Sequence, residues 1–168
     1  MQKLSRYGWR LLWAFLFFLL FLLQGTGWLT VRPLHANPMI LLPFLVIFSM
    51  YHRELSSALT GLAVGIFLDS LSVSSTGFHS IFFFLTGLTV SLIAHYYFNK
   101  NIRSAILLSL IFCLCYYFAR FFFFFLLRGN FTDGTYYLFR TALPSFIYTN
   151  LFSVPFFYLH HIISLKAR

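Results

Sequence analysis

The stretch that decides the fold runs from Leu55 to Ile81, LSSALTGLAVGIFLDSLSVSSTGFHSI. Its apolar part is just long enough to cross a membrane as a helix. Ser57, Gly61 and Gly65 follow one another at intervals of four, and an aspartate, Asp69, continues the interval. Because four residues are slightly more than one helical turn, these side chains form one stripe. Small residues let a neighbouring backbone approach closely in a membrane. The stripe therefore predicts a helix packed inside a bundle, with a polar site near one end.

The composition places most of the chain in a lipid bilayer. Of its 168 residues, 60% are hydrophobic and only 9% are charged, whereas about a quarter of the residues of a soluble domain are charged. A soluble core of this size could not bury so much apolar surface. The chain is therefore expected to be all-α, a polytopic integral membrane bundle that forms a single transmembrane domain over residues 1–168.

Six apolar segments can be drawn along the chain, and the second is short for a helix that spans a bilayer of ordinary thickness. Whether this second segment spans fully is left open by its length. Pro155 is expected to kink the sixth segment. The six segments are residues 9–29, 38–51, 55–71, 78–98, 104–127 and 141–165.

The distribution of charge sets the expected orientation. The formal net charge is +9, and the cations fall mainly in short loops between apolar runs, where an excess of Lys and Arg marks the cytoplasmic side. Six spans with both termini in the cytoplasm place more cations inside than outside. Inside lie Lys3, Arg6, Arg10, Arg53, Lys100, Arg103, Lys166 and Arg168, and outside lie Arg32, Arg128 and Arg140. No basic surface interleaved with aromatic residues indicates nucleic-acid binding.

A polar outer site is expected where the third segment ends and the fourth begins. Its candidate residues carry a carboxylate, two hydroxyls, a glycine and an imidazole: Asp69, Ser72, Ser74, Gly77 and His79. A lone charge inside a bundle is costly. Arg120, near the outer end of the fifth segment, either pairs with Asp69 inside the bundle or extends on its own to the outer headgroups.

The fourth segment carries a second run of small residues, Gly87 and Ser91, which favours close packing against a neighbouring helix. With Ser57, Gly61 and Gly65 they form the expected interface for helix packing or for a partner. The known motifs of catalytic and metal sites are missing from the sequence. We therefore expect no catalytic residues, no metal and no cofactor.

These residues together resemble a known family. Pro38 opens a short helix, Gly61-x-x-x-Gly65-x-x-x-Asp69-x-Leu71-Ser72 follows, and a short loop leads to Gly77-x-His79. The pattern resembles the MreD family of bacterial rod shape-determining proteins, with the specific match over roughly residues 38 to 95. Met39 departs from the pattern, because many relatives have an acidic residue after the proline.

The resemblance implies a non-enzymatic scaffold of the inner membrane, in the complex that elongates the cell and organises peptidoglycan synthesis. Its partners would be MreC, RodA with its class B penicillin-binding protein, MreB indirectly, and membrane lipid; a homodimer is a further expectation. In this reading the third helix packs tightly through its glycine face, and the outer site or a nearby groove receives a partner helix, that of MreC. The family also resembles the substrate-binding subunits of energy-coupling-factor transporters in helix layout. A transporter subunit for a vitamin-sized molecule is therefore the alternative.

Overall fold

The chain folds almost wholly into helices. The computed structural model describes residues 2–26, 38–71, 77–97, 101–123 and 137–166, and it contains no strand in these ranges. The helices are α1 (Gln2–Gly25), α2 (Leu41–Tyr51), α3 (Glu54–Leu71), α4 (Phe78–Tyr96), α5 (Ile102–Phe121), the π-helix η3 (Leu138–Ala142), α7 (Leu143–Leu151) and α8 (Ser153–Lys166). The predicted all-α class is confirmed.

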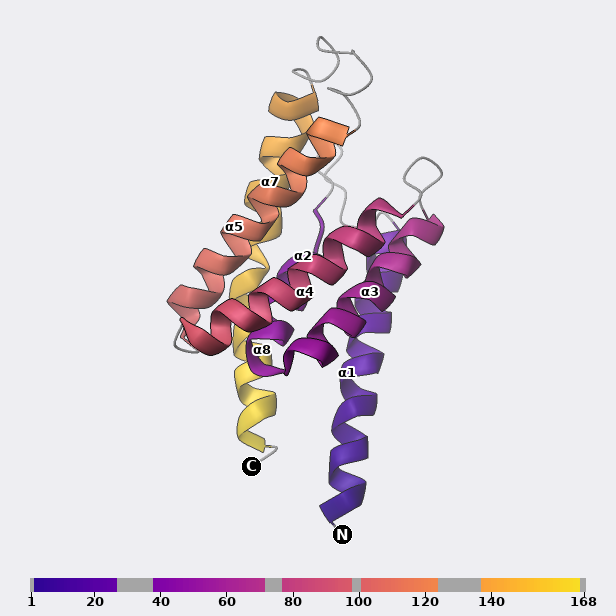
Figure 1. The fold of residues 1–168 in the computed structure, drawn as a ribbon, viewed down its shortest axis with the longest axis vertical. Coiled ribbons are helices and arrows are strands. Elements are labelled where there is room, and N and C mark those ends of the chain that lie inside the picture. The colour runs from indigo at the N-terminus through magenta and orange to yellow at the C-terminus, as the bar shows by residue number, and fades with distance from the viewer. Residues whose placement is uncertain (1, 27–37, 72–76, 98–100, 124–136, 167–168) are drawn as a thin grey trace.

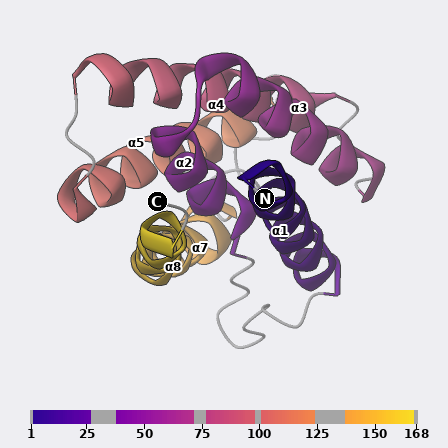
Figure 2. The same cartoon turned by 90° about the horizontal axis from the view of Figure 1, so that it is seen from below.

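The helices α1 to α5 run in alternating directions, η3, α7 and α8 follow one another in a single direction, and both termini lie at the same end of the bundle (Figure 1). We call this end the terminal end, and the opposite one, where α3 and α5 finish and α4 begins, the Asp69 end. Seen along the bundle, α3, α4 and α5 line one side, α1 and α7–α8 the other, and α2 lies between them (Figure 2). An even number of membrane crossings would place both termini at one end, as seen here. The side of the membrane on which the termini lie stays a prediction.

The short helix α2 is the centre of the core. Every residue from Leu41 to Met50 is buried, as expected for a helix that is apolar all round. It contacts α1, α3, α4, α5 and α8. Eleven residues give a length of about 16 Å, roughly half the thickness of the hydrocarbon layer. α2 is thus covered by the longer helices along its whole length.

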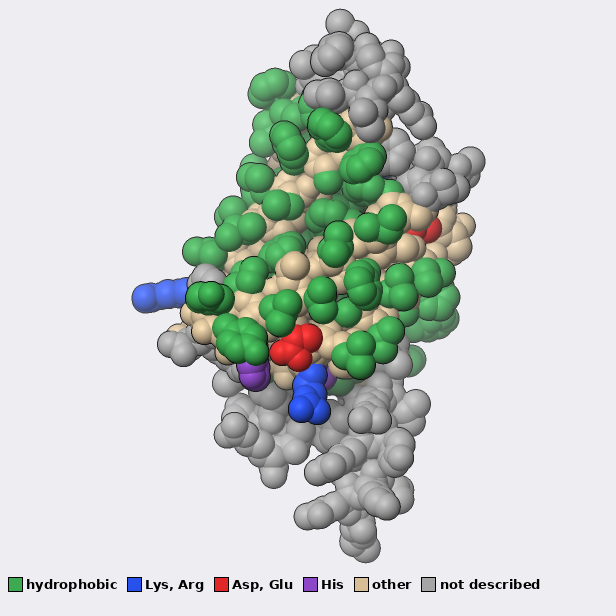
Figure 3. Space-filling model, viewed as in Figure 1, with side chains coloured by type: hydrophobic (Ala, Val, Ile, Leu, Met, Phe, Trp, Pro, Cys, Tyr) green, Lys and Arg blue, Asp and Glu red, His purple; other side chains and the backbone are tan. Residues whose placement is uncertain are grey.

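The outer helices expose apolar side chains instead of polar ones. Hydrophobic side chains cover the face formed by α3, α4 and α5 (Figure 3). The exposed apolar residues of these helices include Ile66, Leu85 and Leu114. These three helices are long and apolar enough to cross a membrane. The chain therefore has the exterior of a membrane protein, and the count of six spans stays a prediction.

Residues 38–40 precede α2 without joining its helix, although all three are buried. Lipid offers no hydrogen-bond partners, so the backbone groups of such a segment must be satisfied by protein. The amide of Gln24 in α1 donates to the Pro38 carbonyl at 2.8 Å and accepts from the Ile40 N–H at 3.0 Å. The Met39 N–H donates to the hydroxyl of Thr149 in α7 at 3.0 Å. Side chains from the first and last parts of the chain therefore hold the start of α2.

α3 and α4 pack with their backbones in contact. A Cβ atom added at Gly61 would lie 2.2 Å from the Phe83 carbonyl oxygen, and one at Gly65 would lie 2.4 Å from Cα of Ser80. In the other direction, a Cβ at Gly87 of α4 would lie 2.4 Å from the Ser57 carbonyl oxygen of α3. Glycine is required at these positions because any side chain would collide with backbone.

The last apolar segment is interrupted, and proline explains where. Pro155 has no N–H for the Leu151 carbonyl and its ring would clash with that oxygen, so α7 ends at Leu151 and α8 begins at Ser153. The predicted kink at Pro155 thus takes the form of a break at Phe152. Pro144 acts similarly on the preceding turn, which widens into the π-helix η3.

The other segment ends differ from the predicted ones by a few residues. α1 already begins at Gln2 and ends at Gly25, α5 runs from Ile102 to Phe121, and α4 ends at Tyr96. The predicted parts 27–29, 98 and 124–127 lie outside the described residues. Hydropathy does not mark the ends of helices, because helices extend into polar flanks such as the one that opens α1.

Replacing Gly61 by alanine is expected to destabilise the protein. Alanine favours an isolated helix over glycine by about 1 kcal/mol, but here its methyl group would displace the α4 backbone, at a cost of roughly 1–3 kcal/mol. The apparent melting temperature in detergent should therefore fall. Ala63→Leu, which enlarges an exposed side chain of the same helix, is the control and should leave it nearly unchanged. An equally stable Gly61→Ala variant would contradict the close α3–α4 contact.

Replacing Gln24 by leucine, which has a similar volume, is expected to loosen the start of α2. Two buried backbone groups, the Pro38 carbonyl and the Ile40 N–H, would lose their partners, at a cost of roughly 1–3 kcal/mol each. Thermal unfolding should begin several degrees lower than in Thr26→Val, which removes only an exposed local hydrogen bond to the Leu23 carbonyl. Equal melting of the two variants would show that Gln24 does not hold this segment.

Candidate functional site: the polar cluster at the start of α4

α4 begins without a cap from its own sequence. Gly77 precedes the helix in the left-handed conformation, with φ of +83°, which glycine adopts without steric cost. It has no side chain to accept a hydrogen bond from the first turn. The first N–H groups of any helix need acceptors from elsewhere, and in a membrane water cannot supply them.

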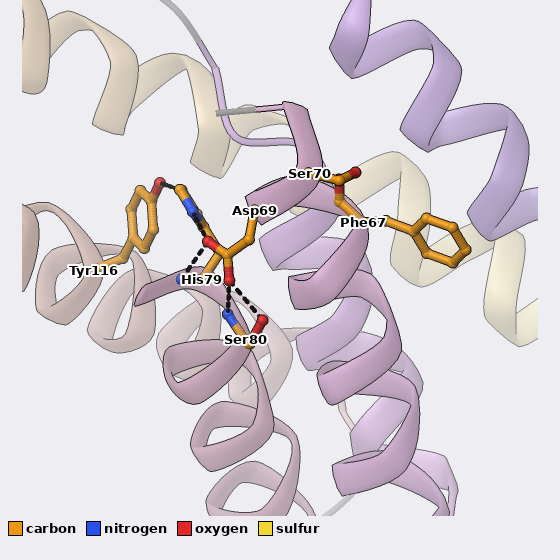
Figure 4. Close-up of polar contacts among 6 residues, drawn as sticks. All are labelled: Phe67, Asp69, Ser70, His79, Ser80 and Tyr116. Carbon is orange, nitrogen blue, oxygen red and sulfur yellow. Dashed lines mark hydrogen bonds and ion pairs between the residues drawn. The ribbon is translucent and has the colours of Figure 1, made fainter. Parts of the chain in front are cut away.

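Asp69, at the end of α3, supplies these acceptors (Figure 4). Its Oδ1 accepts from the His79 backbone N–H at 3.1 Å and lies 2.9 Å from Nδ1 of the same residue. Its Oδ2 accepts from the Ser80 N–H at 2.9 Å and from the Ser80 hydroxyl at 2.5 Å. The carboxylate therefore caps α4 from a neighbouring helix, and its charge faces the positive end of the helix dipole.

The cluster continues from His79 into α5. Nε2 of His79 lies 3.1 Å from the hydroxyl of Tyr116, a side chain that is only 1% exposed. Arg120 follows one turn further along α5, close enough for an electrostatic interaction with the same hydroxyl. Asp69, His79 and Tyr116 thus form one chain of hydrogen bonds from α3 through α4 to α5, which we call the polar chain.

Asp69 and Arg120, the two charges predicted near this end of the bundle, lie beside different groups in the structure. In the described part of the chain, the ion pair that Asp69 makes is with His79. Arg120 lies further along, next to Tyr116. A direct pair of Asp69 with Arg120 stays a prediction, whereas the contact of His79 with the Tyr116 hydroxyl was not foreseen. Of the other expected outer-site residues, Gly77 forms the turn before α4, and Ser72 and Ser74 lie outside the described residues.

The five small residues predicted to form an interface all lie between α3 and α4. The three glycines make the backbone contacts already described, and the backbone of Ser57 faces Gly87. Ser91 donates its hydroxyl to the His52 carbonyl at 2.8 Å, which ties α4 to the turn before α3. Because α4 covers this face, it cannot also receive a helix from a partner. These residues thus serve the packing of α3 on α4, and the binding of a partner stays a prediction.

A second stripe of small polar residues was missed. Ser145, Thr149 and Ser153 also follow one another at intervals of four, and each is at most 1% exposed. Thr149 meets both the Met39 N–H and, at 3.3 Å, the Tyr117 hydroxyl of α5. The four-residue spacing was a sufficient signal for this stripe. Gln24 gave no such signal, because a single amide at the end of an apolar run has no periodicity.

The geometry of the cluster favours a structural role for the carboxylate. A carboxylate has about four acceptor sites, and among the described residues Asp69 makes four hydrogen bonds to two adjacent residues of α4. An oxygen held in this way is stabilised as an acceptor and is poorly placed to remove a proton from a further group. What the cluster does chemically is to fix α3, α4 and α5 to one another at one depth.

Comparison with known proteins identifies one relationship. The model of a family described as MreD, rod shape-determining protein MreD, matches residues 5–163. No curated protein and no solved structure matches the chain. The match extends over nearly the whole of the 168 residues, so it includes α3, α4 and the polar chain.

Replacing Asp69 should release the start of α4. Asp69→Leu removes every acceptor from the first turn and is expected to cost roughly 2–4 kcal/mol. Asp69→Asn keeps one oxygen and should cost less. Melting temperatures in detergent should fall in the order wild type, asparagine, leucine. The matched control is Ser70→Ala, next in sequence, whose hydroxyl bonds only to the Phe67 carbonyl of its own helix. Equal stability of Asp69→Leu and Ser70→Ala would contradict the capping role.

Proposed function

The chain belongs to the MreD family of rod shape-determining proteins, and we propose that it serves rod shape as a scaffold without catalytic activity of its own. In this proposal it lies in the bacterial cytoplasmic membrane as a multi-pass protein. It binds MreC and, through it, joins RodA, the class B penicillin-binding protein and MreB in the complex that organises peptidoglycan synthesis during elongation.

The near-complete family match is the observation that carries the proposal. The architecture supports it in a second way. Polar side chains in the described residues are largely used to hold helices together: Asp69 on α4, Gln24 and Thr149 on the start of α2, and Ser91 on the turn before α3. A bundle locked by its own polar groups is suited to present fixed surfaces to other membrane proteins.

The expected site of partner binding follows from which helix faces are already covered by other helices of the chain. The small-residue face of α3 and α4 is internal, so a partner helix is expected on the lipid-facing sides of the bundle. Association of helices in lipid depends on close packing and a few polar contacts, because lipid is as apolar as the helices themselves. We therefore place the contact with MreC on an exposed apolar face of α3, α4, α5 or α7.

Site-specific photo-crosslinking in cells tests this proposal. A photoreactive residue is placed at one exposed position on each of these helices: Leu59, Ile81, Leu114 or Ile147. We expect at least one position to yield a crosslink to MreC, identified by mass spectrometry. The control carries the same residue at Val90, which is fully buried and should yield crosslinks only within the chain.

Two results would contradict the scaffold. One is recovery of no cell-wall protein from any exposed position in cells that express the chain at its normal level. The other is consistent recovery of a transporter module that binds ATP, which would favour the alternative function as a substrate-binding subunit. Normal rod shape after depletion of the chain would contradict the role of the family itself in these cells.

A further inference from the structure

Exposed cations and tyrosines gather at the terminal end of the bundle. Arg53, in the turn between α2 and α3, and Arg103, in the first turn of α5, are both exposed. Between them in the sequence, α4 ends with His95 and Tyr96, and Tyr97 follows; these three are exposed as well. We call these five residues the basic rim. It borders the hydrophobic face of α3, α4 and α5, where Figure 3 shows Lys, Arg and His side chains along the border nearer the terminal end.

The two arginines of the basic rim are not used to hold the bundle together. In the part of the chain that the structure describes, the ion pair formed is that of His79 with Asp69, at the opposite end. Glu54 directly follows Arg53, but no ion pair joins it to either arginine of the basic rim. Both guanidinium groups are therefore available to anions outside the chain, in contrast to the polar side chains that join the helices.

The sequence adds positive charge to the same end. The first three turns of α1 and the last turn of α8 lie at the terminal end (Figure 1). The sequence has no Asp or Glu before Glu54. The Lys and Arg residues in these two helix ends are Lys3, Arg6, Arg10 and Lys166. An excess of one sign of charge over a surface attracts counter-ions of the other sign, so the terminal end as a whole favours anions.

The tyrosines indicate the depth at which the basic rim lies. Tyr96 and Tyr97 are 73% and 85% exposed, and they end a helix that is long and apolar enough to cross a membrane. Tyrosine at such a helix end lies at the level of the lipid headgroups, with its ring against apolar groups and its hydroxyl in water. Arg53 and Arg103 lie at the starts of two further such helices, α3 and α5, and so at a similar level.

Lipid headgroups are the anions that fit this position. Arginine binds phosphate oxygens in a bidentate manner, and a cation at the membrane surface strengthens the binding of anionic lipid by roughly fivefold. The hydrophobic face of α3, α4 and α5 beside the basic rim offers exposed apolar side chains to acyl chains. One lipid can therefore contact the face with its chains and the basic rim with its headgroup.

We propose that the basic rim binds the headgroups of anionic phospholipids in the leaflet at the terminal end of the bundle. Arg53 and Arg103 contact the phosphate groups, and Tyr96 and Tyr97 fix the depth of α4 between them. The inference goes beyond the scaffold function and does not depend on which proteins the chain binds. It makes the anionic lipid content of one leaflet a determinant of how the bundle is held in the membrane.

Native mass spectrometry of the full chain in detergent tests the proposal. The protein is titrated with phosphatidylglycerol and, separately, with phosphatidylcholine of the same acyl chains. Wild type should retain phosphatidylglycerol in preference. Arg53→Gln and Arg103→Gln should each weaken its binding by roughly fivefold, and the double variant by tenfold or more. The matched control is Arg140→Gln, which removes an exposed arginine of η3, at the Asp69 end, and should bind as wild type does.

The outcomes distinguish a lipid surface from its alternatives. Loss of phosphatidylglycerol in the two single variants, with retention in Arg140→Gln, supports the basic rim. An equal loss in all three would show that only net charge matters and would overturn it, as would unchanged binding in the double variant. Binding of polyglutamate that depends on Arg53 and Arg103, without preference for phosphatidylglycerol over phosphatidylcholine, would overturn the lipid assignment in favour of an acidic protein segment. If the double variant fails to fold, the single variants decide by the same comparison.

Discussion

Backbone groups that leave helical pairing inside a membrane must find their partners within the protein, and this constraint explains most of the polar residues in the bundle. Among the described residues, two helix starts have such partners from distant helices. At the start of α2, Gln24 and Thr149 hold residues 38–40. At the start of α4, Asp69 receives the first N–H groups. In both places a side chain from a distant helix completes the hydrogen bonds, so satisfying the backbone also fixes the tertiary structure.

The sequence predicted the structure correctly where small residues at a regular spacing indicated close helix packing. Intervals of four from Ser57 to Asp69 predicted a tightly packed helix with a polar end, and α3 is such a helix because Gly61 and Gly65 contact the backbone of α4. The spacing could not tell whether the neighbour belonged to the same chain. That distinction depends on the short loop between α3 and α4, which makes them antiparallel neighbours and leaves the stripe no place for a partner.

Other parts of the structure were not predicted, either because no regular spacing in the sequence marks them or because the spacing was overlooked. The function of Asp69 as a cap depends on where α4 begins, and hydropathy defines helix ends poorly. Tyr116 appeared as one aromatic residue among many, and only the fold brings its hydroxyl to His79. The break at Phe152 follows from the missing N–H of Pro155. Thr149 and its neighbours at four-residue spacing were readable in the same way as the α3 stripe.

The resulting molecule has a rigid interior and an apolar exterior, as a membrane scaffold of rod shape would need. α3, α4 and α5 are joined at one depth by the polar chain, and α2 is enclosed by the helices around it (Figures 2 and 4). In the proposed function, such a bundle would present defined surfaces to partners in the membrane.

The most direct measurement is amide hydrogen exchange of the wild-type chain in lipid nanodiscs, resolved for individual residues. If distant side chains satisfy the interrupted backbone, the amides of Met39, Ile40, His79 and Ser80 should exchange as slowly as those inside α2. The exposed first turn of α3, at Leu55 and Ser56, should exchange much faster. Fast exchange at all four amides would show that water or motion, and not Gln24, Thr149 and Asp69, satisfies these groups, and it would contradict the account.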